Sequence, residues 1–204
     1  MHDVEQKPEA FWESHYDAMS PLSNGIPGKI LVRFTEGLAP GKALELGCGR
    51  GDDAVWLAKQ GWQVTAVDLS HRAIEYAAAN AKRAGVDITF QQCDLTQAFP
   101  QDEFSLIVAS FLESPLAFDR ATIFRAALDH VAPGGILLIT SHGKVPGWSK
   151  HTRPFLPAHE VLASLGRLPP GWEVQFCEEV PRTMTGPEGQ QDEVSDAVVA
   201  LKRR

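Results

Sequence analysis

The sequence has 204 residues, a formal net charge of −7 and a pI of about 5.5. That length suits one domain with a substantial core. The negative charge argues against nucleic acid as a partner, because phosphate binding needs a basic face. No apolar run approaches the about 18 residues of a membrane span, and the three widely spaced cysteines show no zinc-ligand pattern. We therefore expect a cytoplasmic protein that binds no metal, membrane or nucleic acid.

The first part of the chain, residues 1–28, is polar and interrupted by prolines. Within it, Phe11, Trp12 and Tyr16 are spaced to share one face of a helix. Two interpretations stay open: the helix packs its aromatic side chains on the core, or it is a lid that places Trp12 and Tyr16 over a ligand. We treat 1–28 as an N-terminal lid segment of a single domain whose main body is 29–204.

Strand-like and helix-like segments alternate through the rest of the chain. The first helix is expected over 29–38, the second from Asp52 to a stop at Gly61, and the third from an N-cap at Ser70 to Gly85. The fourth has an apolar face from Phe124 to Val131 and is ended by Pro133-Gly134-Gly135. A short fifth helix is expected around 161–165. The strands are expected at 43–46, 63–68, 88–94, 104–109, 136–140, 172–180 and 195–201.

This succession predicts an α/β fold with a doubly wound, Rossmann-like, seven-stranded sheet. Five strand–helix units give a mostly parallel sheet with helices on both faces, and the last two strands, joined by a turn at 186–189, give an antiparallel edge strand. The irregular stretch 141–157 has the length of a functional loop.

The first predicted strand runs into a turn with three glycines in five residues, in the segment ALELGCGRG at 43–51. Glycines there allow a sharp turn and the close approach of a ligand. Glu45 is a carboxylate near the end of an apolar strand, where a buried charge needs a partner. The second strand ends at Asp68, and an acid in that place accepts hydrogen bonds from a ribose diol. We therefore expect a nucleotide-like cofactor.

The glycine spacing decides between two kinds of cofactor. The dinucleotide fingerprint G-x-G-x-x-G would put its third small residue at Asp52, where a carboxylate would repel a pyrophosphate. The third glycine instead comes one position earlier, at Gly51. This spacing, with the lack of a Tyr-x-x-x-Lys pair, disfavours a nicotinamide-dependent oxidoreductase. The motif resembles motif I of the class I S-adenosylmethionine (SAM) dependent methyltransferases, whose cofactor carries a sulfonium and no phosphates.

The resemblance covers roughly residues 10–204, because further pieces follow in the family's order. These pieces are VTAVDLS, QQCDL, FSLIVASF and PGGILLI. The segments FWESHY, GCGRGDDAVWLAKQGWQVTAVDLS and TRPFLPAHEV resemble the small bacterial tellurite-resistance and thiopurine-type methyltransferases. The resemblance implies an enzyme that takes a methyl group from SAM, leaves S-adenosyl-L-homocysteine (SAH), and methylates a small molecule such as a thiol, a metalloid or another soft nucleophile.

The resemblance also implies roles for single residues. With the two lid aromatics, the expected cofactor-binding set is Trp12, Tyr16, Glu45, Gly47, Cys48, Gly49, Gly51, Asp68, Leu69, Asp94, Leu95, Ser110 and Phe111. The glycine turn would wrap the methionine part of SAM, and Glu45 would reach its ammonium directly or through water. Asp68 would bind the ribose hydroxyls, and Asp94 would accept a hydrogen bond from the adenine amino group. A second interpretation of Asp94, as a carboxylate that caps a turn, stays open.

The substrate side is less defined. Methyl transfer is an in-line displacement in which the protein supplies proximity, alignment and exclusion of water. A thiolate needs no general base, whereas a hydroxyl usually does. The candidates near the expected mouth are Glu113, His142 and Arg153, of which His142 follows the fifth strand at the face where ligands bind. The sequence leaves open which acceptor is used, whether a base is needed and what the oligomeric state is. It also leaves open that the protein is a sensor that binds SAM without turnover.

Overall fold

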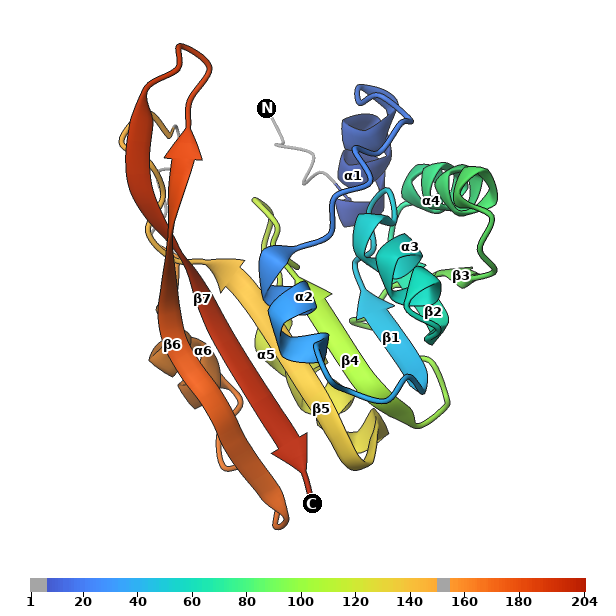
Figure 1. Cartoon of the computed structure of the whole chain (residues 1–204), viewed down its shortest axis with the longest axis vertical. Coiled ribbons are helices and arrows are strands. Elements are labelled where there is room, and N and C mark those ends of the chain that lie inside the picture. The colour runs from blue at the N-terminus through green and yellow to red at the C-terminus, as the bar shows by residue number, and fades with distance from the viewer. Residues whose placement is uncertain (1–6, 150–154) are drawn as a thin grey trace, which may run out of the picture.

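The structure is a computed structural model that describes residues 7–149 and 155–204. Within these residues, one seven-stranded sheet has the order β3-β2-β1-β4-β5-β7-β6 (Figure 1). The strands are β1 Lys42–Leu46, β2 Gln63–Asp68, β3 Thr89–Gln92, β4 Phe104–Ser110, β5 Val131–His142, β6 Trp172–Thr185 and β7 Gln191–Arg203. The helices are α1 Pro8–Asp17, α2 Lys29–Thr35, α3 Asp52–Lys59, α4 His71–Ala84, α5 Arg120–His130 and α6 Ala158–Ser164.

The sheet is mostly parallel, as predicted. Strands β1 to β5 pair in parallel, and β7 lies antiparallel between β5 and the edge strand β6. The strand order reverses between β1 and β4. In open α/β sheets, ligands bind outside the carboxyl ends of the strands at such a switch point. The topology therefore places a site above β1 and β4, where α1 lies in Figure 1.

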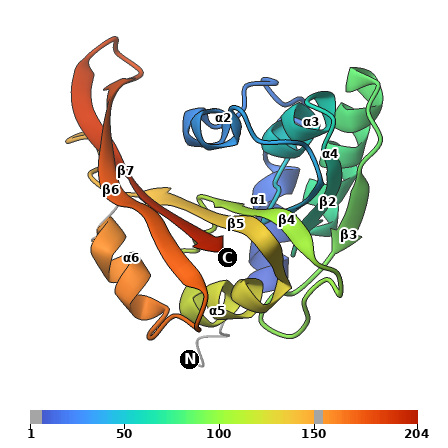
Figure 2. The ribbon, with the colours of Figure 1, turned by 60° about the horizontal axis from the view of Figure 1, so that its bottom comes forward.

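Helices cover both faces of the sheet (Figure 2): α2, α3 and α4 lie on one side, and α5 and α6 on the other. Each side has its own apolar core. Leu31 and Leu57 belong to the first core, and Phe124 and Val161 belong to the second. The doubly covered β4 is accordingly buried along nearly its whole length, which explains its continuous apolar sequence.

The boundary between α5 and β5 differs from the prediction. Val131 was assigned to a helix face, but it starts β5 and pairs with Phe104. The helix ends at His130, so the Pro-Gly-Gly sequence lies inside the strand, where the register shifts and Gly134 has a φ of +79°. At its other end β5 includes Ser141 and His142, so the irregular segment expected from residue 141 begins only after His142.

The last two strands are longer than their apolar patterns suggested. Beyond His142, where β5 ends opposite Asp196, β6 and β7 continue to pair with each other as far as Thr185 and Gln191. This part of the hairpin extends beyond the sheet in Figure 1. It has no core to cover, so its sequence lacks the apolar alternation that marks the inner part. The expected helix over 29–38 stops at Thr35, and the third strand spans only Thr89–Gln92.

Candidate cofactor and substrate site

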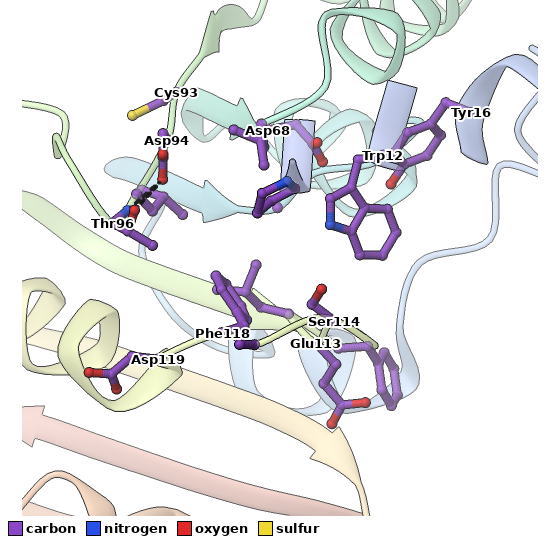
Figure 3. A pocket seen from close by; sticks show the side chains of 17 residues that line it. Trp12, Tyr16, Asp68, Cys93, Asp94, Thr96, Glu113, Ser114, Phe118 and Asp119 are labelled. Carbon is purple, nitrogen blue, oxygen red and sulfur yellow. Dashed lines mark hydrogen bonds between the residues drawn. The ribbon is translucent and has the colours of Figure 1, made fainter. Parts of the chain in front are cut away.

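A cavity of about 230 Å³ lies at the carboxyl ends of the parallel strands, between α1 and the segments that follow β2, β3 and β4 (Figure 3). Eight residues of the expected cofactor-binding set line it, and these are Trp12, Tyr16, Gly47, Asp68, Leu69, Asp94, Leu95 and Phe111. Glu113, expected on the substrate side, also lines it. The structure thus brings together residues that are separated by up to about half the chain.

Five residues of the expected set do not line the cavity: Glu45, Cys48, Gly49, Gly51 and Ser110. Cys48 is buried, and burial raises the pKa of its thiol well above the usual value. Ser110 donates a hydrogen bond to Asp53 Oδ2 at 2.7 Å.

The glycine turn after β1 requires glycine at each of its three positions. Gly47, Gly49 and Gly51 have φ values of +73°, +53° and +80°, which L-residues with a Cβ rarely adopt. A Cβ at Gly47 would approach Leu112 Cδ1 to 2.6 Å, and one at Gly49 would approach the Tyr16 hydroxyl to 3.1 Å. The glycines therefore set the turn and leave room for the side chains that close over it.

In Figure 3, Asp68 lies between Asp94 and Trp12, on the side of the cavity opposite Phe118 and Ser114. It is 7% exposed, and its oxygens accept hydrogen bonds from Gly49 N and Ser70 N, each at 2.9 Å. Burial raises the pKa of this carboxyl, although the backbone hydrogen bonds oppose the rise. A third backbone hydrogen bond, from Leu69, also lowers the pKa of this carboxyl. Of the about four acceptor positions of a carboxylate, at least one therefore remains for a ribose hydroxyl.

Glu45 has an unsatisfied buried oxygen. It is 3% exposed, and its Oε2 has no hydrogen-bond partner among the residues that the structure describes. Burial raises the pKa of its carboxyl well above the usual value, and the nearby Asp53 raises it further, while a hydrogen bond from the Ala54 backbone opposes the rise. An orphan acceptor costs free energy, and a cationic donor such as the ammonium of SAM would satisfy it, directly or through water.

Asp94 lies at the opposite end of the cavity from α1. Its Oδ1 accepts hydrogen bonds from Thr96 N at 2.9 Å and from Thr96 Oγ1 at 2.7 Å. The turn-capping role considered for this residue is therefore present in the structure. Both of these bonds fall on Oδ1, and within the described part of the chain no hydrogen bond is found on Oδ2, which a ligand could therefore use.

Helix α1 rests on the rim of the cavity. None of its residues is buried, so its aromatic side chains do not join the core. Glu13 accepts hydrogen bonds from His71 N at 2.5 Å and Arg72 N at 3.1 Å, which caps the first turn of α4. Burial and the nearby Asp68 raise the pKa of the Tyr16 phenol well above its usual value. This placement favours the lid interpretation, and opening or closing of the helix stays a prediction.

Asp53 connects three parts of the site, and sequence reasoning missed it. Its Oδ1 accepts a hydrogen bond from Gly28 N at 2.7 Å, and its Oδ2 accepts one from Ser110 Oγ at 2.7 Å. It thus ties the segment that leads from α1 to α2 to the end of β4. Burial raises the pKa of its carboxyl. The available signal was the second of two acids directly after the glycine turn.

The substrate-side candidates Glu113 and His142 contact each other. His142 Nδ1 lies 2.5 Å from Glu113 Oε2. Arg120, at the start of α5, donates to Glu113 Oε1 at 3.1 Å. Sequence reasoning missed Arg120 because the segment after β4 has no periodic pattern from which its course could be predicted. The third candidate, Arg153, lies outside the described residues.

The other wall residues that were not predicted come from α1 and from the segments after β3 and β4. They are Pro8, Cys93, Thr96, Leu112, Ser114, Ala117, Phe118 and Asp119. Asp119 also caps α5, with Oδ1 accepting from Thr122 N at 3.1 Å. Within the described residues, no group of three or more His, Cys, Asp or Glu side chains could hold a metal ion, and no helix is long and apolar enough to cross a membrane.

Comparisons with known proteins agree with this geometry. A family model described as a methyltransferase domain matches residues 43–135, which include the glycine turn, Asp68 and Asp94. The chain is 32% identical over 141 residues to a ubiquinone biosynthesis O-methyltransferase of Idiomarina loihiensis, covering 67% of this chain and 58% of that protein. It is 30% identical over 115 residues to a ribosomal RNA small subunit methyltransferase C of Alcanivorax borkumensis, covering 52% of this chain and 34% of that protein.

Among solved structures, TehB from Haemophilus influenzae superposes with a TM-score of 0.72 at 21% sequence identity, over 96% of this chain and 67% of that one. At this identity the likeness shows the shared fold. The curated relatives are longer than the matched region: this chain spans 34% and 58% of the two named above.

Proposed function

Because this chain belongs to the class I SAM-dependent methyltransferases, whose cofactor is SAM, we propose that it transfers a methyl group to a small-molecule acceptor in the cytoplasm and releases SAH. The observation that carries the proposal is Asp68. This buried acid lies beside a left-handed glycine turn and faces a cavity at the switch point of the sheet. That arrangement suits a ribose with an amino-acid tail better than a pyrophosphate.

The protein's own residues bind and shield the reactants, while SAM supplies the activated methyl group when bound. Asp68 and the glycine turn would hold the nucleoside and methionine ends, and Glu45 would provide charge for the ammonium. Trp12 and Tyr16 cover the cavity from α1 and would exclude water. Phe111 lines the cavity and contacts the His142 ring, and it would flank the sulfonium and the acceptor where they meet.

Size and charge support a small acceptor. The cavity lies under a helix that α4 holds in place through Glu13, so a folded RNA or protein would need that helix to move. The net charge of −7 also works against binding to a polyanion.

Incubation with methyl-labelled SAM tests the proposal. Parallel reactions contain a small-molecule cell extract, ribosomal RNA or ribosomal protein, and Asp68→Asn serves as the inactive control. We expect label in the small-molecule fraction only. Label confined to RNA or protein would contradict the acceptor class. Tight SAM binding without any SAH formation would instead indicate the sensor considered from the sequence.

A further inference from the structure

Three polar side chains meet beside the Phe111 wall of the cavity. The Glu113 carboxylate is held by three donors: His142 Nδ1 at 2.5 Å on Oε2, and the His142 backbone N–H and Arg120 Nη1, each at 3.1 Å, on Oε1. Arg120 Nη1 also lies 3.1 Å from Ser141 Oγ. In Figure 3 the Glu113 carboxylate points away from Trp12 and Asp68. The carboxylate therefore has a fixed position, and it fixes the His142 ring.

The contact with Glu113 indicates which tautomer the neutral imidazole adopts. Because Glu113 accepts a hydrogen bond from Nδ1, the neutral ring carries its proton there, and Nε2 keeps a free lone pair. The ring packs between Phe111 and Phe155, at centroid distances of 4.6 and 5.0 Å. The side chain is 38% exposed, so it remains accessible. An imidazole oriented through Nδ1 by a carboxylate, with the lone pair on Nε2, is the arrangement of a general base.

Phe111 connects this pair to the cavity. It lines the cavity and contacts the His142 ring. Its φ of +53° is strained for an aromatic residue, and such strain is found most often at functional sites. Its backbone N–H donates to Thr140 O at 2.8 Å, which ties the end of β4 to β5 just before His142. His142 therefore lies one aromatic ring away from the proposed cofactor site.

We infer that His142 is the general base of the reaction, positioned by Glu113 and Arg120, and that the acceptor is a hydroxyl compound. The inference rests on the proposed function. The acceptor O–H bond breaks and its proton passes to His142 Nε2, while the oxygen bonds to the methyl carbon. The carbon–sulfur bond breaks, and its electron pair stays on sulfur, which gives SAH. The imidazolium then releases its proton to water. A nucleophile already ionised, such as a thiolate, would need no base.

The test compares matched hydroxyl and thiol acceptors in the full chain. Phenol and thiophenol, and 4-hydroxybenzoate and 4-mercaptobenzoate, are assayed with labelled SAM for the wild type, His142→Gln and Glu113→Gln. His130→Gln is the matched control, because His130 also stacks on an aromatic ring, Phe99 at 4.7 Å, and has Nδ1 3.1 Å from a carbonyl, but lies at the other end of β5. Nitrogen NMR of the histidine rings, which needs no acceptor, reports the His142 tautomer.

We expect the wild type to methylate the hydroxyl compounds. With these acceptors, the rate of methylation by His142→Gln should be at least about 100-fold lower. With the thiols, the rate of methylation by this variant should fall less than threefold, and the variant should bind SAH as tightly as the wild type does. NMR should show the Nδ1–H tautomer. Equal losses with both acceptor types, no loss, methylation of thiols alone, or an Nε2–H tautomer would each overturn the inference. A chain that binds SAH and labels no small molecule, in the panel or in a cell extract, would contradict the proposed function and this inference with it.

Discussion

Three carboxyl groups in and around the site are buried. Glu45, Asp53 and Asp68 are each less than a tenth exposed, and burial raises the pKa of all three. Asp53 and Asp68 are satisfied by donors of the protein, whereas Glu45 Oε2 has no partner among the described residues. Glu45 is therefore the group that most needs a cationic ligand.

This difference predicts how stability depends on pH without ligand. A carboxyl with a raised pKa binds its proton more tightly in the folded chain than in the unfolded one. Its favourable contribution is therefore present at low pH and lost as pH rises through the raised pKa. In Glu45→Gln, the free energy of unfolding should therefore fall less steeply with rising pH than in the wild type. Each unit by which folding raises the pKa of Glu45 corresponds to about 1.4 kcal/mol of this difference. Asp53 and Asp68 retain part of the slope in both proteins.

Urea unfolding at a series of pH values from 5 to 8 measures this dependence. Glu36→Gln, an exposed acid at the end of α2, is the matched control and should follow the wild type. Parallel curves for Glu45→Gln and the wild type would show that Glu45 does not carry the cost assigned to it.

At the scale of elements, α1 depends on a few polar contacts with α4. Glu13 caps the first turn of α4, and Asp17 Oδ1 accepts from Arg72 Nε at 2.6 Å. No residue of α1 is buried, so its docking lacks a core of its own. An element held in this way is expected to open more easily than the sheet.

We therefore predict that α1 exchanges its amide protons faster without cofactor than with SAH bound. Glu13→Ala should accelerate exchange of residues 8–17 roughly fivefold, because loss of a helix cap costs about 1 kcal/mol. Glu9→Ala, which removes only a contact with Gln92 Nε2 at 3.1 Å, is the control on the same helix and should have a smaller effect. Hydrogen exchange followed by mass spectrometry decides, and equal protection with and without SAH would contradict a lid.

At the scale of the whole molecule, the sequence predicted the strand–helix alternation and the sheet because its apolar periods reflect burial on two faces. The glycine turn and Asp68 were recognisable because both belong to one local turn, whose conformation depends on residues close together in the sequence. Periodicity could not place Arg120 beside Glu113, or Phe118 in the cavity wall, because the segment after β4 folds back through tertiary contacts. It also misplaced Val131, whose apolar side chain suits a helix face and a buried strand equally well.

Calorimetric titration of SAH into the wild type, Asp68→Asn and the exposed-acid control Asp87→Asn measures what Asp68 contributes to cofactor binding. Asp68→Asn weakens charge-assisted hydrogen bonds worth roughly 1.5–3 kcal/mol each. The account predicts binding by the wild type and the control, and at least about tenfold weaker binding by a folded Asp68→Asn, near 1.4 kcal/mol. Unchanged affinity in folded Asp68→Asn would mean that this cavity is not the SAM site.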